Sequence, residues 1–434
     1  MGHGDEKINI FGLKHAPCPM PDAVTDRIKL LRYKTITAER YLSIEQARII
    51  TRVYRENEGL PVPVKRALAL AASLNEINIS IDPEEIIVGN RTSDIRAGVV
   101  FPEAGISWLL EEIETLPYRQ QDPFKVKEED KIAFIDEIAP YWKGKTLEDD
   151  ILKQYGDELI AIEKVIKINQ KDHAQGHICP NVRDWLNFGP KGLIEKARKK
   201  LLSAGNDKKV FYESVIIALE GARKFMKRYA RMAARMLRDH DDLKIRENLM
   251  MISGICNYLT ERPPEGFREA AQSVWFLFVI LQMESNASSF SPGRMDQYLH
   301  PYFSSYIRSG KSYSEIQEII DSLFIKFNQI IYMRNSHSAR YFAGFPTGFN
   351  ITLGGQNEYG EDATNKLSYM FLKAQEHVRL PQPNLTARLH DGSPDSFISE
   401  CSRIIGLGTG MPQIVNDNSI IPALENAGIV SLPF

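Results

Sequence analysis

The sequence predicts an α/β protein whose first half is mostly helical. Three observations carry this prediction: apolar residues recur at helical spacing through the first half, short extended segments alternate with helices after about Ile319, and 434 residues exceed what one small core sustains. Alternation of strands and helices is typical of α/β architectures. The length alone allows two or three units of about 150 residues, or one large barrel.

Several helices are expected in the first half. Residues 43–74 keep three- and four-residue apolar spacing, and the Gly and Pro residues between positions 59 and 63 divide this stretch into two helices. A long helix is expected over residues 206–237, with Asn206 or Asp207 as its N-cap. The apolar run 274–281 is shorter than the roughly 18 residues needed to cross a bilayer, and it predicts a buried core helix.

Short apolar segments predict the strands. Residues 86–88 (Ile-Ile-Val) indicate a brief strand, and the strings FNITLGG, NLTARLH and QIVND indicate three more in the last quarter of the chain. In NLTARLH, period-two alternation places polar side chains on one face: Asn384, Thr386, Arg388 and His390. This pattern fits either a barrel wall that faces a wet or reactive lumen, or an edge strand with one face in water.

The composition excludes several classes of partner. The chain has 54 basic and 56 acidic residues and a net charge of −2, so no global field favours nucleic acid or an anionic membrane. The first residues lack the continuous apolar core of a secretory signal. The four cysteines are widely spaced singletons, which argues against a disulfide framework and predicts a reducing, cytoplasmic compartment.

Three local patterns imitate ligand sites. GLGTGMP, from Gly406 to Pro412, follows a helical pattern, so it predicts a helix end and a turn into a strand rather than a phosphate-binding loop. His173, His177 and Cys179 offer metal-competent ligands, but the glycine and proline among them fit a loop better than a metal site. The basic residues between Arg223 and Arg238 are typical of a solvated helix face rather than a nucleic-acid stripe.

A set of longer strings carries a family resemblance. VGNR, GHICP, ESNASSFSPGRMDQYLHPY, FNITLGG, RLPQPNLTARLH and LGTGMPQIVND occur in that order between Val88 and Asp417. In these strings the chain resembles the glycyl radical enzymes, which are pyruvate formate-lyase-like proteins, and most of all their glycerol dehydratase branch. The resemblance is collinear from about Thr25 to Gly428. Residues 1–24 are therefore expected to form an N-terminal extension, and residues 25–434 the N-terminal part of a pyruvate formate-lyase-like domain.

The resemblance implies a fold and a chemistry. The family fold is a ten-stranded α/β barrel, of which this chain would form a helix-rich N-terminal half with about five strands. In the family, a radical-SAM activating enzyme installs a glycyl radical, which oxidises a cysteine in a Gly-Cys-Val-Glu turn to the thiyl that abstracts hydrogen from the substrate. The 434 residues contain no Gly-Cys-Val-Glu string, and none of the cysteines occupies the thiyl position. No catalytic residue and no bound cofactor or metal are therefore expected in this chain.

The same resemblance implies a substrate pocket. By comparison with the glycerol dehydratase branch, His177 and Ser289 line it, and His177 binds a substrate hydroxyl; Ser288 and Phe345 stand where that branch has a histidine and a tyrosine. A capping contact within its own loop is the alternative role for His177, and a helix N-cap the alternative for Ser289. Beneath the pocket, Arg294 and Asp296 are expected to form a structural charge pair.

A weaker candidate lies on the polar face of the NLTARLH strand: Arg388 is expected to bind an anionic group of a ligand there.

Two functions follow as hypotheses. The first is a glycyl radical lyase or dehydratase that cleaves a C–O, C–C, C–N or C–S bond of a small molecule, with this chain inactive on its own. Its expected partners are the activating enzyme, a complementary C-terminal half and a second copy in a homo-oligomer. The second is a truncated, non-catalytic remnant or an interaction subunit that keeps the scaffold. Neither hypothesis involves nucleic acid or a membrane.

Overall fold

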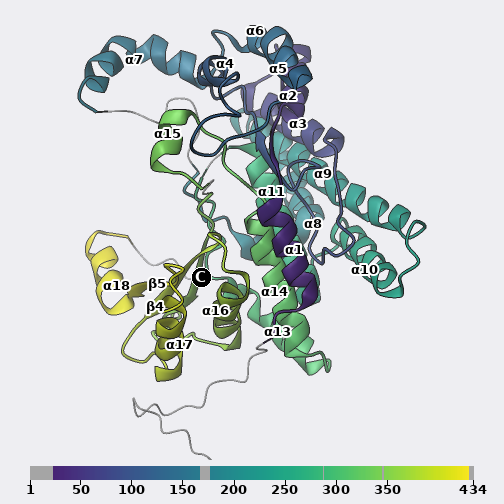
Figure 1. The fold of residues 1–434 in the computed structure, drawn as a ribbon, viewed down its shortest axis with the longest axis vertical. Helices are drawn as coiled ribbons and strands as arrows, with labels where there is room; N and C mark the ends of the chain where they lie inside the picture. The colour runs from purple at the N-terminus through teal and green to yellow at the C-terminus, as the bar shows by residue number, and fades with distance from the viewer. Residues whose placement is uncertain (1–22, 167–175, 287, 345–346, 430–434) are drawn as a thin grey trace, which may run out of the picture.

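The computed structural model describes residues 23–166, 176–286, 288–344 and 347–429. Figure 1 shows a large helical body joined to a smaller lobe in which α16 and α17 lie beside strands β4 and β5. The helices before residue 170 are α1 (Asp26–Thr37), α2 (Glu45–Glu56), α3 (Val62–Glu76), α4 (Ser107–Glu112), α5 (Glu128–Ala133), α6 (Ala139–Trp142) and α7 (Leu147–Glu163), with a π-helical turn over Phe134–Ile138. The later helices are α8 (Val182–Leu202), α9 (Asn206–Met236), α10 (Leu243–Leu259), α11 (Phe267–Glu284), α12 (Met295–Tyr298), α13 (His300–Arg308), α14 (Tyr313–Phe327), α15 (Ser336–Tyr341), α16 (Lys366–Val378), α17 (Asp395–Ile405) and α18 (Asp417–Asn426).

The helices expected from periodicity are confirmed. Helices α2 and α3 replace the single periodic stretch and are separated at the Gly- and Pro-containing turn. Helix α9 begins at Asn206 as expected, but the N-cap predicted at Asn206 or Asp207 is wrong. The N-cap residue is Gly205, and no side chain accepts a hydrogen bond from the first N–H groups of this helix. Asn206 is already helical, and a residue inside the helix cannot adopt the extended backbone that a cap requires.

The strands form two separate parallel sheets. β1 (Arg40–Ser43) pairs with β2 (Arg96–Val99), and β4 (Asn384–Leu389) lies between β3 (Asn350–Gly354) and β5 (Gln413–Asn416). The three strands predicted in the last quarter of the chain are thus confirmed. Phe349, Ile351, Leu353, Leu385 and Ala387 are fully buried, so the alternation correctly identified the face that packs on the helices.

Helix α11 is the central buried helix, as the apolar run 274–281 predicted. Fourteen of its 18 residues are buried, and it packs against α3, α8, α10, α13 and α14. Figure 1 shows α11 in the middle of the helical body, with α1 and α14 beside it. A helix that is apolar all round is stable only when neighbours cover every face.

The strand predicted at residues 86–88 is wrong. This extended segment pairs with the side chains of α11 instead of another strand. Gln272 accepts a hydrogen bond from the Val88 N–H at 2.8 Å and donates to the Val88 carbonyl at 2.7 Å. Arg268 donates to the Ile86 carbonyl, and Trp275 Nε1 donates to the Gly89 carbonyl at 2.9 Å. Buried peptide groups need such partners, and here one helix face supplies four of them.

The remaining local predictions concern surfaces and ends. The glycine-rich string links α17 to β5 through a turn, as expected. The basic face of α9 makes internal contacts: Arg223 pairs with Glu220 and Glu261, and Arg228 donates to the carbonyls of Leu74 and Ile77. Within the described ranges, no helix is long and apolar enough to span a membrane. The division at residue 24 and the cytoplasmic compartment stay predictions.

Replacing Gln272 should measure how strongly α11 holds the 86–89 segment. We expect Gln272→Met to leave the N–H and the carbonyl of Val88 without partners and to lower the free energy of unfolding by about 2–6 kcal/mol, at about 1–3 kcal/mol per group. The control is Gln329→Met, because Gln329 is also buried but, among the described residues, its side chain donates only to the Thr35 hydroxyl, at 3.3 Å. Urea denaturation followed by circular dichroism measures both, and equal losses would contradict this assignment.

Candidate functional site

The structure brings the predicted pocket residues together although more than a hundred positions separate them. The His177 N–H donates to the Ser288 carbonyl at 3.2 Å, and the Ser291 N–H donates to the Ile178 carbonyl at 2.8 Å. These two bonds make a parallel bridge between Ile178 and Phe290. His177, Ser288 and Ser289 therefore lie side by side on two neighbouring extended segments.

The second of these segments also pairs with β3. The Ser289 N–H donates to the Thr347 carbonyl at 2.6 Å, and Gly293 makes a parallel bridge with Ile351 through bonds of 3.0 and 2.9 Å. The segments 177–178 and 288–293 thus continue the β3-β4-β5 sheet on the β3 side. All the pairings are parallel, so one curved wall carries the predicted pocket residues at one end.

His177 and Ser289 both have unusual backbone conformations. His177 has φ 48° and Ser289 has φ 63°, and they are two of the four non-glycine residues with positive φ in the described part of the chain. The left-handed region costs an L-residue about 1–2 kcal/mol, so the surrounding structure must impose it. Residues held this way concentrate at functional sites. The role of these residues in a substrate site stays a prediction.

Two glycines permit the close approach of these segments. A Cβ on Gly176 would lie 2.2 Å from the Phe290 ring, and a Cβ on Gly348 would lie 3.0 Å from Ser289 Oγ. Gly348 also has φ 72°, which other residues rarely adopt. Phe290 itself is buried, at 3% exposure. The glycines thus hold the loops against each other tightly enough to fix the Ser289 backbone.

The alternative role of Ser289 as a helix N-cap does not match the structure. Ser289 cannot cap a helix, because the next helix, α12, begins at Met295 and has Arg294 before it. The His177 N–H bonds to the neighbouring segment and its side chain is exposed, and the choice between its two roles stays a prediction. Phe345 and His173 lie outside the described residues. Within those residues, no group of three metal-competent side chains occurs.

A buried arginine positions the loop that carries Ser288 and Ser289. Arg91, at 3% exposure, donates to the Gln282 carbonyl in the last turn of α11, to Asn286 Oδ1 and to the Ile331 carbonyl, at 3.4, 3.5 and 2.6 Å. A cation at a helix C-terminus stabilises the exposed carbonyl dipoles. The VGNR string, which ends in Arg91, contributed to the family resemblance, but only the tertiary structure shows which carbonyl groups Arg91 binds.

The structure shows what each member of the expected charge pair binds. Arg294 donates to the carbonyls of Gly354 and Gln356, at 2.7 and 3.0 Å, whereas Asp296 accepts from the Gly354 N–H at 2.8 Å and from Ser368 at 2.6 Å. Both side chains bind the end of β3, and the charge of Arg294 also acts to lower the pKa of Asp296. Burial raises the pKa of Asp296, and its hydrogen bonds from Ser368 and Gly354 oppose this rise.

The polar face of the sheet is satisfied internally. Arg388 forms a two-bond ion pair with Asp417, at 2.7 and 2.9 Å, so it is not available to steady an anionic ligand. Asn350 and Thr386 bond to each other across β3 and β4, and His390 Nε2 lies 3.2 Å from Asp362 Oδ1. The sequence analysis missed the role of Asp417. The available signal was its position, because it directly follows the QIVN strand, and that strand pairs with the one that contains Arg388.

Substitution of Gly348 should test whether close packing fixes Ser289. We expect Gly348→Ala to lower the free energy of unfolding by about 1–3 kcal/mol more than Gly360→Ala, because overpacking adds to the backbone cost. Gly360 is the matched control: its φ is 78°, and its Cβ would meet nothing within 4 Å. Urea unfolding of both variants measures the difference, and equal losses would show that the contact with Ser289 is not restrictive.

Comparisons with known proteins agree with this architecture. A family described as pyruvate formate lyase-like matches residues 21–432. The chain is 32% identical over 423 residues to the probable dehydratase YbiW of Escherichia coli K12, covering 94% of this chain and 52% of that protein. It is 30% identical to the isethionate sulfite-lyase of Oleidesulfovibrio alaskensis, covering 89% of this chain and 49% of the relative.

A solved structure gives the same result. The glycerol-bound form of the B12-independent glycerol dehydratase from Clostridium butyricum superposes with a TM-score of 0.91 at 35% identity, covering 95% of this chain and 53% of that one. The chain spans about half the length of the relatives it matches. The count of about five barrel strands stays a prediction. The chain belongs to the pyruvate formate lyase-like family of glycyl radical enzymes.

Proposed function

We propose that this chain supplies the N-terminal part of a glycyl radical lyase or dehydratase that cleaves a C–O, C–C, C–N or C–S bond of a small substrate. The carrying observation is the wall on which His177, Ser288 and Ser289 meet, two of them in strained backbone conformations. The relatives named dehydratase and sulfite-lyase support the same reaction class. The family's thiyl chemistry, generated by a glycyl radical, would supply the hydrogen abstraction.

In this proposal the chain's own residues bind and orient the substrate. The His177 imidazole bonds a substrate hydroxyl, and Ser289 presents a second polar group beside it. Ser288 and Phe345 replace a histidine and a tyrosine of the glycerol dehydratase branch, so two polar contacts are changed. A site built to bind a hydroxyl discriminates against ligands that leave its polar groups unpaired. We therefore infer a substrate other than glycerol.

The proposal includes a partner for the open side of the sheet. In the described part of the chain, β5 is paired on one edge only, and Ile414, Ile420 and Leu424 are 43–47% exposed around it. A strand edge flanked by apolar surface readily pairs with another chain segment. We propose that a complementary C-terminal half covers it, that a radical-SAM activating enzyme acts on the complete assembly, and that the assembly is a homo-oligomer.

The 434-residue chain alone should carry no radical. We expect anaerobic incubation with a family activating enzyme and S-adenosylmethionine to give no glycyl doublet by EPR, because the sequence contains no Gly-Cys-Val-Glu string and no matching radical-glycine segment. Full-length Clostridium butyricum glycerol dehydratase treated with its own activating enzyme is the positive control. A glycyl doublet on the 434-residue chain would contradict the prediction.

Substrate turnover should depend on His177 more than on Ser288. In a chain completed with the second half of a relative, we expect His177→Ala to reduce kcat/KM by about 10-fold or more, the value of one hydrogen bond to an imidazole. Ser288→Ala should change it by less, because a small side chain already replaces the family histidine there. Anaerobic product assays measure both variants. Equal losses would reject the role of His177, and a folded but inert assembly would favour the non-catalytic scaffold.

A further inference from the structure

A small cavity lies beside the carboxyl group of Glu103, in the loop between β2 and α4. The cavity measures about 10 Å³, and Ile50, Leu70 and Met283 supply part of its apolar wall. A space of this size admits about one water molecule at most. Glu103 Oε2 is buried and has no hydrogen-bond partner among the described residues. Solvent therefore cannot fully hydrate this carboxyl group when it carries a charge.

Titratable side chains from three helices face Glu103 around this cavity. They are Tyr54 of α2, Arg66 of α3 and Glu284 at the end of α11. The first residue of α7 donates its N–H to the Glu103 carbonyl, and the neighbouring Glu148 accepts a hydrogen bond from a serine of α4. Of the described residues that line the cavity, Arg66 alone is a cation.

Arg66 binds the end of α11. Its guanidinium donates to the Glu284 carboxylate through Nε at 3.1 Å and through a second nitrogen, and to the Glu284 carbonyl at 3.1 Å. Glu284 is the last residue of α11, and the loop with Ser288 and Ser289 follows directly. A cation at a helix C-terminus stabilises the exposed carbonyl dipoles. Arg66 thus helps to hold the helix end from which this loop begins.

Two carboxyl groups compete for this guanidinium. Burial raises the pKa of Glu103 from 4.5 to about 7; its own N–H and the charge of Arg66 oppose the rise, and the charge of Glu284 adds to it. A neutral Glu103 does not attract Arg66. An ionised Glu103 is a buried charge whose nearest cation is bound to Glu284, and such a charge is costly until a cation reaches it.

We propose that Glu103 is a proton-binding residue that controls how firmly the end of α11 is anchored. Protonated, it leaves Arg66 bound to Glu284. After releasing its proton to solvent, it draws Arg66 away from the Glu284 carbonyl, and the loop that carries Ser288 and Ser289 becomes less restrained. The proposal does not depend on the proposed reaction, because it concerns the position of one loop of this chain.

Urea unfolding at about pH 5.5 and about pH 8 tests the proton site. Glu103 holds its proton more tightly in the folded chain, so its contribution to stability is fully present below about pH 4.5 and is lost as pH rises through about 7. Between the two conditions, we expect the unfolding equilibrium constant of the wild type to rise by about 10- to 100-fold more than that of Glu103→Gln, which stays neutral. Glu111→Gln, at an exposed position of α4, is the matched control and should keep the wild-type pH response.

Hydrogen–deuterium exchange at about pH 8 tests the link to the loop. We expect the peptide that contains Ser288 and Ser289 to exchange several-fold more slowly in Glu103→Gln than in the wild type, and at the wild-type rate in Glu111→Gln. If Glu103→Gln does not fold, Glu103→Met is the neutral variant for both measurements. An unchanged pH response or unchanged exchange of that peptide in the neutral variant would overturn the proposal. Failure of both neutral variants to fold would also contradict it, because the charge of Glu103 would then be required.

Discussion

The hydrogen bonds between one face of α11 and the extended segment 86–89 are the interaction on which the rest of the structure depends. Arg268, Gln272 and Trp275 stand at i, i+4 and i+7, so they lie in a row on the helix and bind backbone groups of Ile86, Val88 and Gly89 in that order. The segment then leads directly to Arg91, which returns to the C-terminal end of the same helix. These bonds fix the position of the segment along the buried helix, and Arg91 fixes the point from which the loop after the helix begins.

This fixed starting point explains how the site can contain strained residues. The loop after α11 pairs with the 177–178 segment on one side and with the start of β3 on the other, through short backbone bonds. Each pairing has glycine at its point of closest approach, where a side chain would collide with Phe290 or Ser289. Left-handed conformations at His177 and Ser289 persist because contacts on both sides hold them in place. Burial of the apolar side chains on the helix-facing side of the sheet offsets the energy cost of these two backbone conformations.

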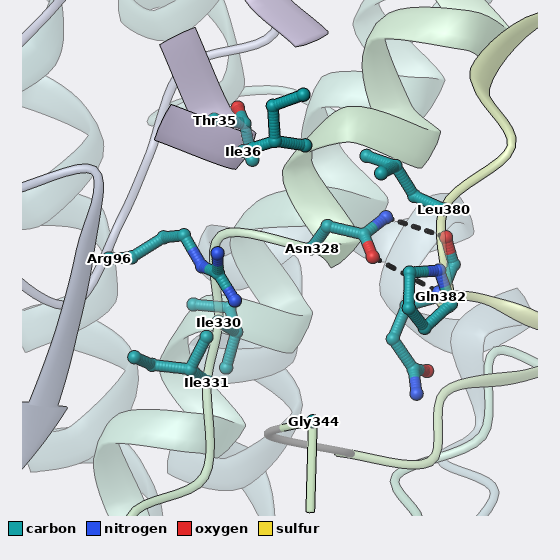
Figure 2. A pocket seen from close by; sticks show the side chains of 10 residues that line it. Thr35, Ile36, Arg96, Asn328, Ile330, Ile331, Gly344, Leu380 and Gln382 are labelled. Carbon is teal, nitrogen blue, oxygen red and sulfur yellow. Dashed lines mark hydrogen bonds between the residues drawn. The ribbon is translucent and has the colours of Figure 1, made fainter. Parts of the chain in front are cut away.

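The charged side chains of the wall have mainly structural roles. Arg388 is neutralised by Asp417, and Arg294 and Asp296 both hold Gly354 at the end of β3. Paired in this way, buried charges are tolerated, whereas a missing partner would leave an expensive unpaired charge. In the other sheet, Arg96 lies opposite Arg40 in the β1-β2 register, and Figure 2 shows its side chain pointing into a cavity.

The sequence by itself determined the elements whose signal is local. The periodicity of α2, α3, α9 and α11, the alternation in β3 and β4 and the ordered family strings were all readable, because each depends on neighbours a few residues apart. The tertiary structure decided the rest. Residues 86–88 have a strand-like composition but bind helix side chains, the segments around His177 and Ser289 join a sheet without strand-like composition, and Asn206 lies inside the helix it was expected to cap. For residues 86–88 and for the segments around His177 and Ser289, the deciding hydrogen bonds join positions far apart in the chain. The spacing of neighbouring residues does not determine which distant peptide group a side chain or loop will bind.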